Sequence, residues 1–173
     1  IFSAYYKEQW YEASSIETIF DTNRAWTSHL HQLVELFDDF KVICCVRNPA
    51  WIMDSFERIY RKNPFDYSRM YNAQTRQTVY TRCEAIANVQ GAMGSAWTSL
   101  KEAYYGEYSD RLLLIDYDLL TQYPERSLAL VYNFLAVDPY SHDFNNVEYE
   151  AGEFDTNIGV KGLHTVKKKV EFS

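Results

Sequence analysis

The amino-acid sequence predicts an α/β fold in which helices cover both faces of a parallel sheet, giving three layers. Two observations lead to this prediction. Strand-like apolar runs alternate along the chain with segments of helical periodicity, which is typical of parallel strand–helix units. The clearest runs are apolar at every position, as strands buried on both faces usually are. With 173 residues, the chain should form one domain, with residues 138–173 as an irregular tail.

The first predicted unit is a short strand at residues 19–23 followed by a helix. Apolar residues three and four positions apart indicate that helix: Leu30, Leu33, Val34 and Phe37. The second unit has its strand at residues 42–46 and a helix that begins at Asn48-Pro49. Asn accepts hydrogen bonds from the first helical turn and Pro fits the first helical position. This helix should end near Lys62, because a second Asn-Pro pair follows.

A helical pattern returns from Val79 to Tyr105. Gly91 and Gly94 within it predict a break or a close approach between backbones. The third strand is predicted at residues 112–115, and the helix after it runs from Pro124 to Leu135. No apolar stretch approaches the roughly 20 residues needed to cross a bilayer, so no membrane partner is expected.

Composition narrows the range of functions. A formal net charge of −7 argues against nucleic acid as a partner, because such a surface needs an excess of Lys and Arg. Any anion should therefore bind in a local pocket. The three cysteines, Cys44, Cys45 and Cys83, lack the spacing of metal ligands. We expect them to be buried, reduced thiols, which suits a cytoplasmic protein.

Arg47 stands at the carboxyl end of the strand at residues 42–46. In open α/β sheets, ligands bind beyond the carboxyl ends of the strands, and the start of the following helix favours anions. Ser55 lies two helical turns further along. A guanidinium, a hydroxyl and a helix start together predict a phosphate site. In the alternative interpretation, Arg47 forms an ion pair with Asp54 or Glu57 and Ser55 is only a solvated residue.

Val46-Arg47-Asn48-Pro49, followed eight residues after the arginine by Ser55, resembles the 3′-phosphate-binding segment of sulfotransferases. Residues 21–26 and 113–120 resemble other parts of that family. The resemblance implies a P-loop-NTPase-like sulfotransferase fold. It also implies transfer of a sulfonate group from 3′-phosphoadenosine 5′-phosphosulfate (PAPS) to an acceptor hydroxyl, without a metal. Arg47 and Ser55 would then bind the donor's 3′-phosphate. The acceptor would be a small molecule or a carrier-bound group.

The tail supplies further candidates. Residues 157–167 resemble bacterial members of the family, and Lys161-Gly162 is similar to the basic-glycine pair that closes over the 3′-phosphate. The resemblance therefore adds Lys161 and Gly162 to the donor-binding residues. It also implies that the tail covers the donor.

Two departures from the family pattern matter. The family's first strand–helix unit holds the 5′-phosphosulfate with a loop like Gly-x-x-Gly-Ser-Gly-Thr, which these residues lack. We expect this unit to be missing and the chain alone to be a candidate for an inactive enzyme. Many members also use a His soon after the turn that is Thr22-Asn23-Arg24 here. His29 and His164 are the remaining candidates for the general base, with neither preferred, and His31 is interpreted as a surface residue.

Two other functions compete with sulfonate transfer. A nucleotide kinase shares the architecture but needs a Gly-Lys-Ser or Gly-Lys-Thr phosphate loop, which the sequence does not contain. A non-catalytic nucleotide-binding module that kept only the 3′-phosphate contacts remains the main alternative. The sequence does not determine the acceptor, and it is compatible with a homodimer.

Overall fold

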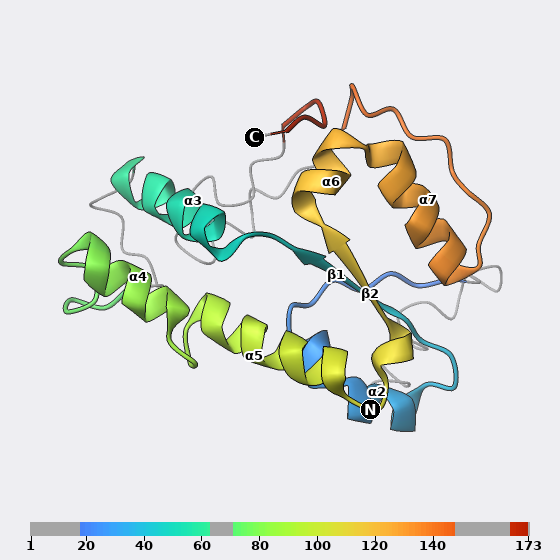
Figure 1. Cartoon of the computed structure of the whole chain (residues 1–173), viewed down its shortest axis with the longest axis horizontal. Helices are drawn as coiled ribbons and strands as arrows, with labels where there is room; N and C mark the ends of the chain where they lie inside the picture. The colour runs from blue at the N-terminus through green and yellow to red at the C-terminus, as the bar shows by residue number, and fades with distance from the viewer. Residues whose placement is uncertain (1–17, 63–70, 148–166, 173) are drawn as a thin grey trace, which may run out of the picture.

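The computed structural model describes residues 18–62, 71–147 and 167–172. Figure 1 shows two strands at the centre, with α7 and α5 on different sides of them. In chain order the elements are η1 (Trp26–Ser28), α2 (Leu30–Leu36), β1 (Val42–Val46), α3 (Pro49–Lys62), α4 (Val79–Ala87), α5 (Ala92–Tyr105), η2 (Ser109–Arg111), β2 (Leu112–Asp116), α6 (Tyr117–Gln122) and α7 (Pro124–Leu135).

The strands β1 and β2 form a parallel two-stranded sheet, in which Val42 pairs with Leu112 and Val46 with Asp116. The predicted α/β class and the parallel arrangement are therefore confirmed. The predicted bounds of both strands agree with the structure to within one residue. Because the strands are parallel, their carboxyl ends, and the residues that follow, lie at the same edge of the sheet.

The strand predicted at residues 19–23 is wrong, because the described chain has no strand there. Asp21 accepts a hydrogen bond from Trp26 Nε1 at 2.8 Å. Asn23 accepts one from the N–H of Ala25 at 2.9 Å through its side chain. Such local bonds of Asp and Asn favour turns over strand pairing. Residues 19–23 are therefore irregular, and a turn at Arg24-Ala25 leads into η1.

The principal core lies near the amino ends of the two strands. Buried side chains from α2, β1 and α5 meet there, and partly buried hydrophobic residues, most of them aromatic, pack against them: Leu30, Leu33, Val42 and Ala103, with Trp26, Phe37, Phe40, Tyr108 and Leu112. Successive side chains of a strand point to opposite faces, so the buried Ile115 lies on the face away from Leu112. The helix α7 packs against β2, and Lys41 Nζ donates a hydrogen bond to the carbonyl of Phe134 near the end of α7.

The helices follow the predicted pattern with one difference. The predicted break falls between α4 and α5, where a Cβ on Gly91 would collide with the carbonyl of Ala85. The short α6 was not predicted. It begins because Asp116 accepts a hydrogen bond from the N–H of Leu119 at 2.9 Å, which caps the helix immediately after β2.

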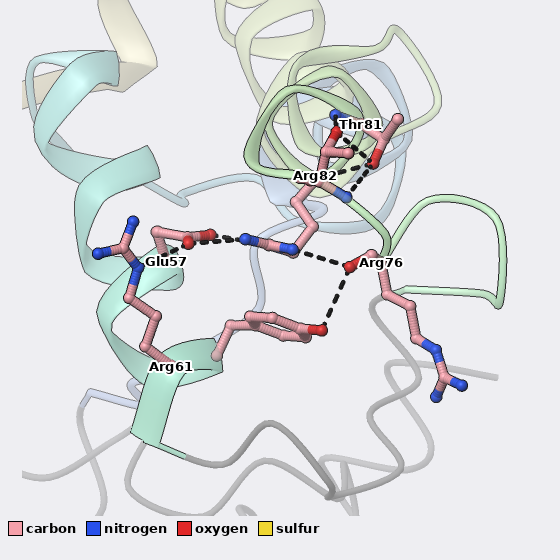
Figure 2. A network of polar contacts seen from close by, with 7 residues as sticks. Glu57, Arg61, Arg76, Thr81 and Arg82 are labelled. Atoms are coloured by element: carbon pink, nitrogen blue, oxygen red, sulfur yellow. Dashed lines mark hydrogen bonds and ion pairs between the residues drawn. The ribbon is translucent and has the colours of Figure 1, made fainter.

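A buried ion pair joins α3 to α4 (Figure 2). Arg82, only 6% exposed, donates from Nε and Nη2 to the two carboxylate oxygens of Glu57 at 2.8 and 2.7 Å. Its Nη1 donates to the carbonyl of Arg76 at 2.8 Å, and its guanidinium stacks 4.0 Å from the ring centre of Tyr60. The hydrogen bond from Arg82 lowers the pKa of Glu57. Burial raises the pKa of the neighbouring Tyr71 to about 12.

The three cysteines are free thiols, but the prediction that they are all buried is wrong. Cys45 is exposed, and Cys44 and Cys83 are half-buried. The reason is the small size of the described sheet, whose two strands leave part of β1 uncovered. Partial burial raises the pKa of the Cys44 thiol, and the neighbouring Cys45 raises it further.

Candidate anion-binding site

The candidate site lies at the carboxyl end of β1, where Arg47 follows the last strand residue. The neighbouring strand β2 ends alongside and is followed directly by α6. The register places Arg47 opposite Tyr117, and the guanidinium lies 4.2 Å from the centre of the Tyr117 ring. The aromatic ring therefore supports Arg47 through a cation–π contact.

Asp118 is the carboxylate partner of Arg47 among the residues that the structure describes. Its Oδ1 lies 3.6 Å from Arg47 Nε, and the Arg47 side chain is 19% exposed. The contact involves Nε of the guanidinium and not its two terminal nitrogens, Nη1 and Nη2. The terminal nitrogens of an arginine can donate hydrogen bonds to two oxygens of one phosphate. The carboxylate therefore partly balances the positive charge of Arg47, and the Tyr117 ring packs against its guanidinium.

The alternative pairing of Arg47 with Asp54 or Glu57 is not what the structure shows. Asp54 forms an ion pair with Arg58, and Glu57 is shared between Arg61 and Arg82. Both carboxylates lie on α3, whereas the partner of Arg47 comes from the start of α6. The parallel register of the strands decides this pairing.

Ser55 lies in the second turn of α3 and is exposed. Trp51, one turn earlier on the same side of the helix, is 49% exposed. The described residues offer the Ser55 hydroxyl no hydrogen-bond partner, so it is accessible to a ligand that approaches the start of α3. The structure thus places Arg47 and Ser55 on one continuous strand–helix unit, in the order that the sequence predicted.

The start of α3 does not offer the open backbone amides that a helix start was expected to provide. Pro49 has no N–H group, and the N–H of Ala50 donates to Asn48 Oδ1 at 2.9 Å. The N–H groups of Trp51 and Ile52 donate to the Asn48 carbonyl at 3.0 and 3.3 Å. Asn48 therefore occupies the first-turn donors. An anion here would depend on Arg47, on Ser55 and on the helix dipole.

Of the other predicted site residues, His29 lies within the part of the chain that the structure describes. His29 is exposed between η1 and α2, beside the core at the amino ends of the strands. Five strand residues, or about 16 Å, separate that end from Arg47. His164, Lys161 and Gly162 lie outside the described residues. Their assignments stay predictions.

Sequence reasoning missed Asp118 and Tyr117 as contacts of Arg47. A signal existed, because both follow a strand predicted to run parallel to β1. It also passed over His142, whose Nε2 lies 2.6 Å from the hydroxyl of Tyr132. That pair involves the end of α7, away from Arg47, and belongs to a cluster of aromatic rings with Tyr140 and Phe144.

The described residues show neither a metal-binding cluster nor a helix that could cross a membrane. They contain no group of three or more His, Cys, Asp or Glu side chains arranged to hold a metal ion. None of the helices formed by these residues combines the length and apolar character needed to cross a membrane.

Comparison with known proteins gives one match. A family model described as "Sulfotransferase family" matches residues 1–142, which is more than half of the chain and includes Arg47, Ser55, Tyr117 and Asp118. Searches of curated proteins and of solved structures found no match.

Proposed function

Because the chain belongs to the sulfotransferase family, we propose that it transfers the sulfonate group of PAPS to a hydroxyl group of an acceptor. The observation that carries the proposal is the position of Arg47 at the carboxyl end of β1, in contact with Asp118 and Tyr117. The exposed Ser55 follows on α3. This is the segment that resembles the 3′-phosphate-binding segment of the family. We also propose that the two described strands belong to the three-layer, P-loop-NTPase-like sheet of that family.

In the proposed complex, the terminal nitrogens of Arg47 and the hydroxyl of Ser55 donate hydrogen bonds to the donor's 3′-phosphate. Asp118 has a positioning role, since its contact with Arg47 Nε limits the directions that the guanidinium can take. Lys161 and Gly162 would close over the same phosphate. Four contacts at one end of the nucleotide fix its register, so that the sulfonate at the other end meets the acceptor.

The transfer itself exchanges one sulfur–oxygen bond for another. The acceptor oxygen attacks sulfur and gives its proton to a base, while the bond between sulfur and the phosphate oxygen breaks. Adenosine 3′,5′-bisphosphate leaves with the electron pair. His29 and His164 are the proposed candidates for the base. The acceptor would be a small molecule or a carrier-bound group, and no metal is required. The free thiols suit a cytoplasmic location.

A non-catalytic nucleotide-binding module is the second candidate. The contacts described here account for binding of the 3′-phosphate, whereas turnover also needs groups that stabilise the departing phosphate. The two functions share the 3′-phosphate site and differ in turnover.

Calorimetric titration with adenosine 3′,5′-bisphosphate tests the site, with adenosine 5′-monophosphate as the control ligand. We expect binding that requires the 3′-phosphate. Arg47→Ala should weaken it by about 1.5–3 kcal/mol, the value of a lost charge-assisted hydrogen bond. Arg58→Ala, on the exposed side of α3, is the matched control and should leave the affinity within about twofold.

Equal binding of the two ligands, or an unchanged affinity in Arg47→Ala, would refute the site. Turnover is measured separately, by release of adenosine 3′,5′-bisphosphate from PAPS in the presence of phenolic and alcoholic acceptors. Specific binding without turnover would identify the binding module instead of the enzyme.

A further inference from the structure

The charges of this chain are unevenly distributed. Residues 58–82 contain six basic residues and one acidic residue, a net charge of +5. The other 148 residues contain 11 basic and 23 acidic residues, a net charge of −12. At physiological salt a charge acts over about 8 Å. An anionic group close to this segment is therefore attracted, although the chain as a whole repels it.

Four of these cations are exposed at one end of the described structure, which we name the basic end: Arg58, Arg61, Lys62 and Arg76. The basic end consists of the last turns of α3, the turn at residues 71–78 and the start of α4. The buried pair of Glu57 and Arg82 holds these parts together (Figure 2). Arg58 and Arg61 have carboxylate partners on α3. Arg76 has no ion-pair partner within the described ranges.

Arg76 is fixed by its backbone. Its N–H donates to the carbonyl of Asn72 at 3.1 Å. Its own carbonyl accepts from Arg82 Nη1 at 2.8 Å and from the Tyr60 hydroxyl at 3.2 Å. Figure 2 shows the Arg76 side chain directed away from this network. Because the turn is already ordered, binding through Arg76 would lose little conformational freedom beyond that of its side chain.

Exposed apolar side chains stand close to Arg76 in the sequence. Tyr80, in the first turn of α4, is 86% exposed, and Val79 before it is 41% exposed. The capping Thr78 accepts a hydrogen bond from the N–H of Thr81 at 3.1 Å and keeps this turn rigid. Arg and Tyr are the residues that most often dominate protein–protein binding. A nucleic acid would instead require a broad basic face, which a remainder of net charge −12 does not provide.

We propose that the turn at residues 71–78 and the first turn of α4 form a docking site for an acidic segment of a partner protein. The terminal guanidinium nitrogens of Arg76 donate hydrogen bonds to a carboxylate of that segment, and Tyr80 packs against the segment's apolar atoms. The cations at the end of α3 attract the partner and speed its approach. The docking site does not depend on the proposed sulfonate transfer.

Fluorescence anisotropy with a labelled peptide rich in Glu and Leu tests the docking site on the whole 173-residue chain. We expect binding that weakens as salt rises. Arg76→Glu should raise the Kd about tenfold and Tyr80→Ala at least about threefold. The matched control is Lys101→Glu, which makes the same exchange of a cation for an anion at an exposed position of α5 and should change the Kd less than about twofold.

The Arg76 side chain has no contact within the described structure that folding requires, so the variant should keep the thermal unfolding curve of the parent. Arg76→Gln is the second variant, with a smaller effect in the same direction. The proposal fails if the peptide does not bind, or if Lys101→Glu weakens binding as much as Arg76→Glu. It also fails if a DNA oligonucleotide of equal charge binds as tightly as the peptide and Tyr80→Ala weakens neither complex, because the basic end is then a general polyanion surface.

Discussion

Replacing Glu57 by Gln tests whether the buried ion pair holds α3 and α4 together. The Arg82 side chain is 8% exposed and that of Glu57 12%, and two charge-assisted hydrogen bonds of 2.8 and 2.7 Å join them. In Glu57→Gln, an amide NH₂ replaces one of the acceptor oxygens and the cation loses its counter-charge. Removing one partner of a buried pair costs about 3–5 kcal/mol. Arg82 keeps its bond to the Arg76 carbonyl, so we expect about 3 kcal/mol.

Urea unfolding and thermal unfolding measure this loss. For a chain of this size, about 3 kcal/mol corresponds to a fall in Tm of about 6–12 °C. Asp54→Asn breaks the exposed pair with Arg58 and should cost less than about 0.5 kcal/mol. The double variant Glu57→Leu, Arg82→Met should recover much of the stability, because an apolar pair leaves no buried charge. If Glu57→Gln costs no more than Asp54→Asn, the pair does not stabilise the contact and our reasoning is wrong.

Two further predictions concern stability. The pKa of Glu57 is lowered in the folded protein, so its stabilisation is present above the ordinary carboxylate pKa of about 4.3 and is lost as pH falls through the lowered value. The difference in unfolding free energy between the parent and Glu57→Gln should therefore be constant above about pH 6 and shrink in acid; a difference that grows in acid would contradict it. Ala136 ends α7 with φ 57°, a conformation that suits Gly, so Ala136→Gly should stabilise the protein by about 0.5–1 kcal/mol in urea unfolding. The control Ala129→Gly, inside α7, should destabilise it by a similar amount, and two variants with the same sign would count against this view.

Elements marked by local signals could be predicted from the sequence. The strand β1 is a continuous apolar run, and α3 and α7 begin at Pro49 and Pro124, each at the first helical position. The strand expected at residues 19–23 had only a short apolar stretch, and its Asp and Asn side chains bond locally instead. The six-residue α6 is too short to show helical periodicity. Its cap, Asp116, comes directly after the residues predicted as the third strand.

The candidate site was predictable as far as chain order determines it. Arg47 and Ser55 belong to one strand–helix unit, so their placement follows from the bounds of β1 and α3. The partner of Arg47 does not follow from chain order, because Asp118 lies 71 positions further along. Sequence reasoning chose carboxylates on α3, within a few turns of Arg47. Only the register of β1 against β2 brings Asp118 and Tyr117 to the arginine.

That register has a consequence for how the protein acquires its site during synthesis. Residues 47–111 separate the end of β1 from the start of β2, and closing a flexible loop of this length costs about 4 kcal/mol plus a constant. The helices α3, α4 and α5 can form earlier from local contacts and shorten the span to be closed. A nascent chain that has not yet reached Asp118 therefore contains Arg47 without either of the residues that orient it. The anion site is completed only after β2 and the start of α6 have emerged and paired, late in the folding order.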